Sequence, residues 1–232
     1  MENESLEQIK AYFNSFSKLT KQSNTLITPE KISTSKVQDF FHDVSPLHQK
    51  NLNSGSLINV WTVSGIKRNE VRNTAVLAWW LDCHESHGLG SQLLTRVLND
   101  HMPKFNTLVI KVDPYRTRPE SLPLGELDNR IDIEMSSRAV LIFWEVKIDA
   151  QEGKEQLNRY HTLLNAKANK IQEKCLIYLT PDSGKQHHST PYTYGITWSQ
   201  LANSFRDVLE SIPEENLSKA LLFQYCEHIS TF

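Results

Sequence analysis

The sequence predicts an α/β fold in which a mixed central sheet is flanked by helices. Short runs rich in β-branched residues alternate with segments of helical periodicity. Their order is helix, strand, strand, strand, helix, strand and then helices, which is typical of a sheet covered by helices. At 232 residues the chain is long enough for one well-filled core. We therefore interpret residues 1–232 as a single domain, with a possible helical addition over 1–55, the core over 58–180 and C-terminal helices over 195–232.

The helices are predicted from apolar residues at three- and four-residue spacing. They cover residues 5–19, 67–83, 91–100, 152–166, 198–209 and 217–229. Residues 20–56 are rich in Ser, Thr, Asn and Lys, and we interpret them as a loop or a helical excursion. Glu70 lies on the apolar stripe of its helix with Thr74 and Leu77, whereas a solvated acid would lie on the opposite side.

Four strands are predicted. The β-branched run over 107–112 is the first, and a Pro- and Arg-rich loop over 113–125 follows it. Two apolar runs separated by a tight polar turn, between Asp128 and Ile148, then predict a hairpin. Residues 175–179 form a short buried strand.

Composition limits the class of protein. The net charge is −2, which argues against tight, non-specific nucleic-acid binding by the free chain but leaves room for a local basic groove. Three widely spaced cysteines fit a reducing compartment. The acidic N-terminus does not resemble a signal peptide, and no apolar run approaches the roughly 20 residues of a membrane span. We expect a cytoplasmic protein without membrane association.

The hairpin carries charged residues where buried strands normally carry hydrophobic ones. Asp132 lies between two isoleucines, and Glu145 and Lys147 end a long apolar run. Residues two apart on a strand share a face, so Glu145 and Lys147 project together. Two carboxylates on neighbouring strands suit Mg²⁺, to which the backbone carbonyl of Val146 could add a ligand, and Lys147 would hold the attacking water or stabilise developing charge. A cross-strand ion pair on a solvated sheet explains the spacing equally well.

A resemblance bears on this choice. Asp132, followed by Glu145-Val-Lys147, resembles the signature of the PD-(D/E)XK nuclease superfamily. Gln156 and Tyr160 match the Gln-x-x-x-Tyr extension of some branches, and residues 69–90 resemble the opening helices of one bacterial branch. The resemblance implies a restriction-endonuclease-like α-β-β-β-α-β core.

The resemblance also implies residue roles. It makes Glu70 a helix acid that helps to bind metal, and Gln156 and Tyr160 residues that orient and brace a ligand. The sequence departs from the pattern at Arg72-Asn73, where His-Ser is common, and at Trp144, where a small aliphatic residue is usual.

Simpler interpretations exist for several of these residues. Glu70 could serve only the positive end of its helix, and Gln156 and Tyr160 could pack on the sheet. Cys83, His84 and His87 lack the further ligands that a structural zinc site needs. A second set, Arg116, Arg118 and Arg130, could follow a phosphate backbone or be ordinary surface arginines.

The leading hypothesis is a nuclease dependent on Mg²⁺ or Mn²⁺ that cuts DNA. Asp132, Glu145 and Lys147 would carry the reaction, Gln156 and Tyr160 would support them, and the resemblance suggests a role in bacterial defence or repair. The alternatives are a catalytically inactive binding or regulatory module of the same fold, and a nuclease for RNA. A homodimer or a partner protein is possible, since cutting both strands of a duplex is easier with two active sites.

Overall fold

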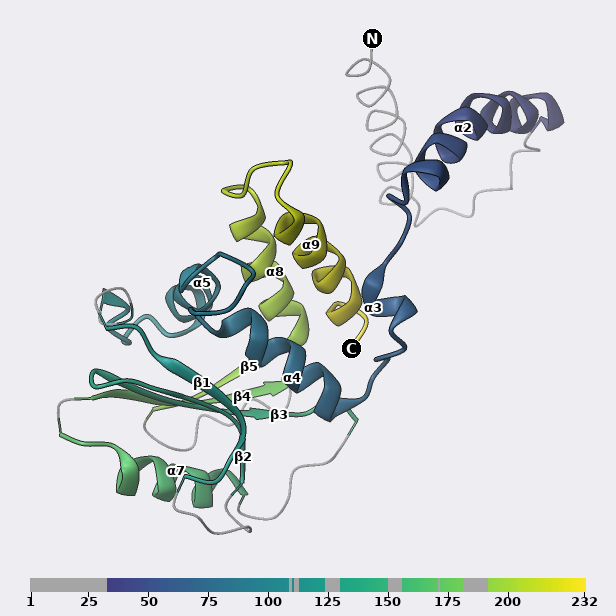
Figure 1. The fold of residues 1–232 in the computed structure, drawn as a ribbon. Coiled ribbons are helices and arrows are strands. Elements are labelled where there is room, and N and C mark those ends of the chain that lie inside the picture. Colours follow the sequence, from purple (N-terminus) through teal and green to yellow (C-terminus); the bar gives the residue numbers. More distant parts are fainter. Residues whose placement is uncertain are drawn as a thin grey trace. The chain divides into compact units, whose positions relative to one another are not determined.

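The computed structural model describes residues 33–108, 110, 113–123, 130–149, 156–170, 172–181 and 192–232. The chain divides into two compact units, Met1–Leu57 and Ile58–Phe232 (Figure 1). The helix predicted over 5–19 lies outside the described residues. The first unit contains α2 (Thr34–Ser54), so the described part of the segment left open as loop or helix is helical. Within the ranges described, no helix combines the length and apolar character that a membrane crossing requires.

The second unit is built on a mixed sheet, as predicted. Its order is β1-β2-β3-β4-β5, with antiparallel pairing from β1 to β3 and parallel pairing from β3 to β5. The strands are β1 (Arg116–Ser121), β2 (Ile131–Ser136), β3 (Val140–Val146), β4 (Glu173–Thr180) and β5 (Thr193–Thr197). The hairpin and the buried strand after it therefore form the centre of the sheet.

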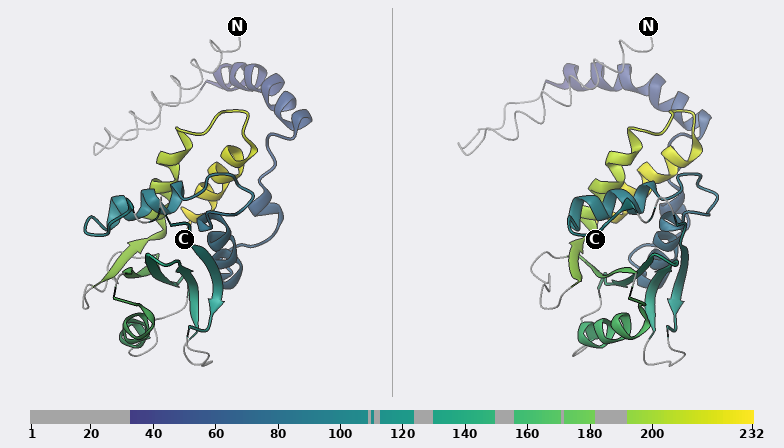
Figure 2. Two further views of the ribbon diagram at one scale, coloured as in Figure 1. Left: turned by 60° about the vertical axis from the view of Figure 1, so that its left-hand side comes forward. Right: turned by 90° about the vertical axis from the view of Figure 1, so that its left-hand side faces the viewer.

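Helices cover both faces of this sheet (Figures 1 and 2). One face packs on α7 (Gln156–Lys167). The other face carries most of the core and is covered by α4 (Glu70–Leu81) and α8 (Trp198–Leu209). α5 (Gln92–His101) and α9 (Leu217–Ile229) pack against α8, and the short α3 (Val60–Val63) packs on α9. The ends of α8 and α9 agree with the sequence prediction, because strong apolar periodicity and caps at Thr197 and Asn216 define them.

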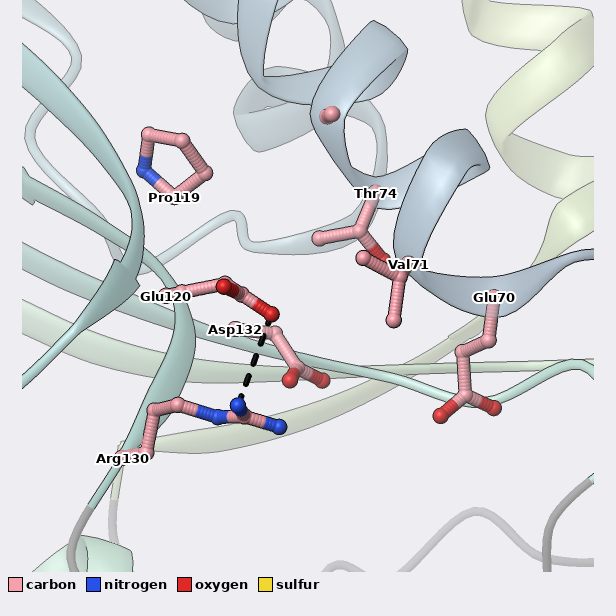
Figure 3. Close-up of a pocket in the computed structure, with 8 residues that line it drawn as sticks. Glu70, Val71, Thr74, Pro119, Glu120, Arg130 and Asp132 are labelled. Carbon is pink, nitrogen blue, oxygen red and sulfur yellow. Dashed lines mark ion pairs between the residues drawn. The ribbon is translucent and has the colours of Figure 1, made fainter. Parts of the chain in front are cut away.

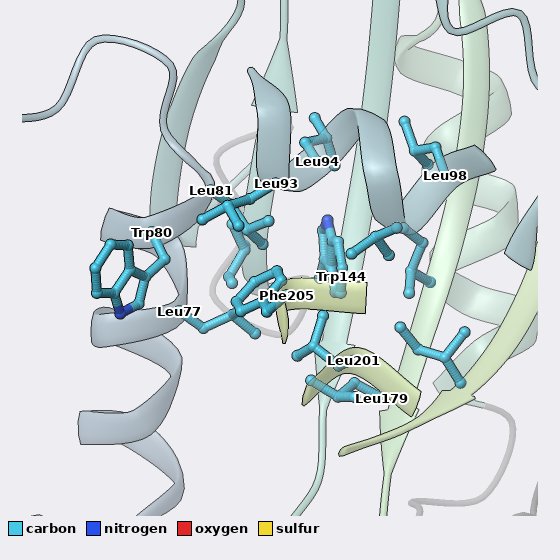
Figure 4. Packing of buried hydrophobic residues seen from close by; sticks show 14 of the residues in the cluster. Leu77, Trp80, Leu81, Leu93, Leu94, Leu98, Trp144, Leu179, Leu201 and Phe205 are labelled. Carbon is cyan, nitrogen blue, oxygen red and sulfur yellow. The ribbon is translucent and has the colours of Figure 1, made fainter. Parts of the chain in front are cut away.

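The alternation along β3 determines which side chains face which layer. Val140, Ile142, Trp144 and Val146 belong to the larger core cluster, and Leu141 and Phe143 pack against α7. Figure 4 shows Trp144 among leucines of α4 and α5 and beside Phe205 of α8. Glu145 and Lys147 continue the row that faces α7. The unusual Trp144 therefore projects away from Glu145 and fills the core.

The prediction of a strand over 107–112 was wrong. Thr107 lies in a turn, Leu108 and Ile110 are helical, and residues 111 and 112 lie outside the described residues. The first strand is β1, inside the predicted loop. It lies at the edge of the sheet with an exposed, polar surface, so no apolar alternation marks it. Its Pro119 lacks an N–H group, which an edge strand tolerates.

Two further differences are local. α4 begins at Glu70 rather than 67, because the Asn69 side chain caps it by accepting a hydrogen bond from the backbone N–H of Arg72. β5 was not predicted: it has five residues and contains a glycine, so it resembles a loop in sequence.

Candidate active site

The site lies where β3 ends and brings together the two predicted strand acids. Ile133 pairs with Trp144, and continuing this antiparallel register by one residue places Asp132 opposite Glu145. Asp132 Oδ2 accepts a hydrogen bond of 2.8 Å from the backbone N–H of Val146. Burial raises the pKa of Asp132, although this hydrogen bond acts in the opposite direction. A carboxylate is thus held against the end of the neighbouring strand.

Glu145 is the most deeply buried acid of the site, with 1% of the residue exposed. Its Oε1 lies 2.5 Å from Lys147 Nζ and 2.6 Å from Gln156 Nε2. Its Oε2 is buried and has no hydrogen-bond partner among the described residues. Burial, and then the charge of Asp132, raise the pKa of Glu145 to about 7. A buried carboxylate oxygen without a partner is costly, so an electropositive ligand at this point would be favourable.

Lys147 lies between two carboxylates. Its Nζ is 2.5 Å from Glu145 and 3.7 Å from Glu70 Oε1. Burial favours the neutral form, but the nearby carboxylates, above all Glu145, outweigh burial and raise the pKa of Lys147. Lys147 is therefore a positively charged ammonium and not a general base at neutral pH.

The backbone of Lys147 is fixed from two directions. Its N–H donates to the carbonyl of Leu179 on β4 at 2.8 Å, and its carbonyl accepts from Trp198 Nε1 at 2.8 Å. The next residue, Ile148, donates its N–H to Glu70 Oε2 at 3.0 Å. Glu70 thus joins the start of α4 to the end of β3.

Glu70 lies at the start of α4 and faces Lys147. It is the first residue of α4, where the helix dipole favours a negative charge, and it also approaches Lys147. Asn73, at one of the departures from the resemblance, is buried away from the site. Its Nδ2 donates to the carbonyls of Lys67 and Asn69, and its Oδ1 lies 2.9 Å from His228 Nε2. Asn73 therefore joins the start of α4 to α9.

The first two turns of α7 bring an amide and a hydroxyl to the acids. Gln156 Nε2 contacts both Glu145 Oε1 and Tyr160 Oη, the latter at 2.8 Å. The Tyr160 hydroxyl donates to the carbonyl of Arg130 at 2.9 Å, just before β2. Burial raises the pKa of Tyr160, so it remains a neutral donor. Both residues face the sheet, and they connect α7 to the two strands that carry the acids.

A pocket of about 200 Å³ borders Asp132 (Figure 3). It lies between α4 and β1, and its lining residues are Glu70, Val71, Thr74, Ala75, Pro119, Glu120, Arg130 and Asp132. Arg130 forms an ion pair of 3.5 Å with Glu120 across this pocket. Of the three arginines singled out in the sequence, Arg130 alone is among the lining residues, and Arg116 and Arg118 lie on β1.

Sequence reasoning missed a second buried acid on β2. Glu134 is fully buried, and both of its carboxylate oxygens lie 2.8 Å from Lys167 Nζ at the end of α7. Ser121 Oγ donates to the same carboxylate at 2.8 Å. The available signal was the position of Glu134, two residues after Asp132 on an apolar strand.

The candidate zinc residues have other roles. The His87 ring is 2% exposed, with Nδ1 accepting from the Leu89 N–H and Nε2 contacting the carbonyl of Asp82. Cys83 Sγ donates to the carbonyl of Tyr115. Within the described residues no three His, Cys, Asp or Glu side chains form a group that could hold a metal ion, and this includes Glu70, Asp132 and Glu145.

The comparison with protein families agrees with the predicted resemblance. A model described as PD-(D/E)XK nuclease superfamily matches residues 58–227. No curated protein and no solved structure matches the chain. The assignment to one bacterial branch stays a prediction, whereas the family and its restriction-endonuclease-like fold are established. The chain belongs to the PD-(D/E)XK nuclease superfamily.

Proposed function

We propose that this protein is a divalent-metal-dependent nuclease that hydrolyses phosphodiester bonds in DNA. The observation that carries the proposal is the Glu145 carboxylate, which is buried beside the Lys147 ammonium and has one oxygen without a partner among the described residues. Burying such a group is unfavourable for folding alone. Its position next to Asp132, in a chain of this superfamily, supports a catalytic site.

Mg²⁺ or Mn²⁺ fits the chemistry of the donors at this site. Glu145 Oε2 and the carboxylates of Asp132 and Glu70 are hard oxygen ligands of the kind that these ions prefer. When bound, the ion would polarise the phosphoryl oxygen and acidify a bound water. The Val146 carbonyl remains a predicted further ligand.

Lys147 acts as a fixed positive charge in this proposal. Its raised pKa keeps the ammonium protonated, so it donates hydrogen bonds to the attacking water or to the phosphoryl oxygens. Gln156 holds the orientation of Glu145 through Oε1, and Tyr160 supports Gln156. The other oxygen of Glu145, Oε2, is thereby left available for the metal ion.

The substrate and the cellular role are proposed from the resemblance to the superfamily. DNA is preferred to RNA through the resemblance, which also suggests bacterial defence or repair in the cytoplasm. Arg130 beside the pocket could contact a phosphate.

The test is cleavage of linear and circular duplex DNA, single-stranded DNA and RNA with Mg²⁺, Mn²⁺ or EDTA. We expect metal-dependent cutting that Asp132→Asn and Lys147→Ala each reduce by at least about 10²-fold. The exposed Lys104→Ala variant is the control for loss of a lysine, and it should cut like the wild type. Full cutting by the Lys147→Ala protein would contradict the role given to Lys147, and cutting of RNA alone would replace DNA as the substrate.

A second candidate function is a non-catalytic binding or regulatory module. The observation in its favour is that the site acids, as described, do not form a three-ligand group. Thermal unfolding with and without millimolar Mg²⁺ or Mn²⁺ separates the two functions, because an ion that binds only the folded state raises the Tm. An unchanged Tm together with no cutting would favour the module.

A further inference from the structure

The pocket beside Asp132 contains an ion pair whose acidic member has an unusual backbone. Glu120 lies on β1 between Pro119, which pairs with Ile133, and Ser121, which pairs with Ile131. Glu120 thus stands opposite Asp132 on the neighbouring strand. Its φ is +50°, in the left-handed region that residues other than glycine rarely adopt. The strand is therefore locally distorted at the position facing a candidate metal ligand.

The distorted residue lines the pocket and meets Arg130 there. Figure 3 shows the two side chains reaching toward each other beside Asp132. Both are about half exposed, at 49% for Glu120 and 54% for Arg130, and they are 3.5 Å apart. An exposed ion pair of this kind contributes less than about 1 kcal/mol. Arg130 can therefore leave Glu120 for a stronger partner at little cost.

A phosphodiester is such a partner. The guanidinium group binds carboxylates and phosphates through the same planar arrangement of donors. The rest of the pocket suits the sugar next to that phosphate, because Val71, Ala75 and Pro119 supply apolar walls. With a volume of about 200 Å³ the pocket is smaller than the roughly 300–1,000 Å³ of drug-sized sites, so it has room for a phosphate group and part of the adjoining sugar.

We propose that Glu120 occupies the place of a substrate phosphate in the free protein, and that nucleic acid displaces it so that Arg130 binds that phosphate. This inference rests on the proposed function. Asp132 borders the same pocket, so the phosphate held by Arg130 neighbours the one that is cut. Glu120 then lowers affinity for nucleic acid by competing for Arg130, and Arg130 positions the strand.

The experiment is a double-mutant cycle on binding. Wild type, Glu120→Gln, Arg130→Gln and the double variant are titrated in EDTA against a fluorescently labelled single-stranded oligonucleotide and the duplex of the same sequence. The readout is fluorescence anisotropy, and EDTA prevents metal-dependent cutting. Arg138→Gln is the matched control, because Arg138 is 92% exposed and pairs with Asp113 away from the pocket.

We expect Glu120→Gln to tighten binding roughly two- to fivefold, the range that release of an exposed ion pair gives. Arg130→Gln should weaken binding and lower the slope of log Kd against log salt by about 1, as the loss of one phosphate contact does. In the Arg130→Gln background the effect of Glu120→Gln should disappear, because no arginine is left to release. Arg138→Gln should change the salt slope less than Arg130→Gln.

Two results would overturn the proposal that a substrate phosphate displaces Glu120 from Arg130. A gain in affinity from Glu120→Gln that persists in the Arg130→Gln background would show a general charge effect, and equal affinities in all four proteins would show no role for the pair. If the wild type cuts nucleic acid in the separate assay, either result contradicts this displacement but not the nuclease activity. A wild type that neither cuts nor binds contradicts this displacement and the proposed function together.

Discussion

Lys167 Nζ lies 2.8 Å from both carboxylate oxygens of Glu134, at the opposite end of α7 from Gln156. Gln156, Tyr160 and Lys167 lie on the side of α7 that faces the sheet, with Leu163 and Leu164 buried between them. The helix is therefore held to the sheet by polar contacts at both ends and by an apolar centre. The contact at one end includes the candidate catalytic carboxylate.

Removing Lys167 should destabilise the fold. The Lys167→Met variant leaves the Glu134 carboxylate buried without its cation, and we expect a loss of about 3 kcal/mol in the free energy of unfolding. Urea denaturation measures this loss. Removing both charges with Glu134→Gln and Lys167→Met should recover much of it, whereas Arg138→Met, which breaks a pair involving a highly exposed arginine, should cost less than about 1 kcal/mol. A single variant as stable as the wild type would contradict this account.

The Tyr160 hydroxyl should affect cleavage through its hydrogen bond with Gln156. Tyr160→Phe removes the donor to the Arg130 carbonyl and the partner of Gln156, at a cost of about 1–2 kcal/mol in stability. Because Gln156 then loses part of its orientation toward Glu145, we expect kcat to fall about tenfold with a smaller change in KM. Steady-state cleavage rates at varied substrate concentration measure both. Thr162→Ala, on the exposed side of the same helix, is the control and should cut normally.

Metal binding should weaken in acid. Glu145 must be ionised to hold a cation, and its pKa is about 7 in the metal-free protein, so protons compete with the ion below that pH. We expect the apparent affinity for Mg²⁺ to fall about tenfold between pH 8 and pH 6. Titration calorimetry at the two pH values measures it. The Glu145→Gln variant should lack the pH-dependent part of the Mg²⁺ affinity. An Mg²⁺ affinity independent of pH in the wild type would exclude Glu145 as a ligand.

Replacing Glu120 by glycine should stabilise the protein. Because glycine adopts positive φ without steric cost, Glu120→Gly should raise the free energy of unfolding by about 1 kcal/mol. Lys67→Gly is a matched control, since Lys67 has a φ of +44° on an exposed segment. Both variants should gain stability in thermal unfolding, but only Glu120→Gly should alter nucleic-acid binding. A loss of stability in Glu120→Gly alone would mean that the Glu120 side chain supports the fold.

The sequence predicted the elements that carry a clear apolar run or stripe. β2 and β3 are apolar runs, and α8 and α9 bury apolar residues at helical spacing. Asp132, Glu145 and Lys147 were found because they are charged residues within or at the end of such runs. β1 could not be predicted because an exposed edge strand has no apolar face to reveal it. The Glu134–Lys167 pair joins residues 33 apart, and the left-handed backbone of Glu120 is not encoded by its residue type. These features depend on tertiary contacts, which cannot be predicted from the local pattern of apolar and polar residues.

The hydrogen bond from Trp198 to the Lys147 carbonyl has a consequence for the order of events during synthesis. The strand that carries Glu145 and Lys147 leaves the ribosome some fifty residues before Trp198 does. Until α8 has emerged and packed, the backbone at Lys147 lacks this anchor, and the core cluster around Trp144 lacks Leu201 and Phe205. A growing chain therefore holds the backbone at Lys147 through the Leu179 contact alone until α8 packs against the sheet and Trp198 supplies the second contact.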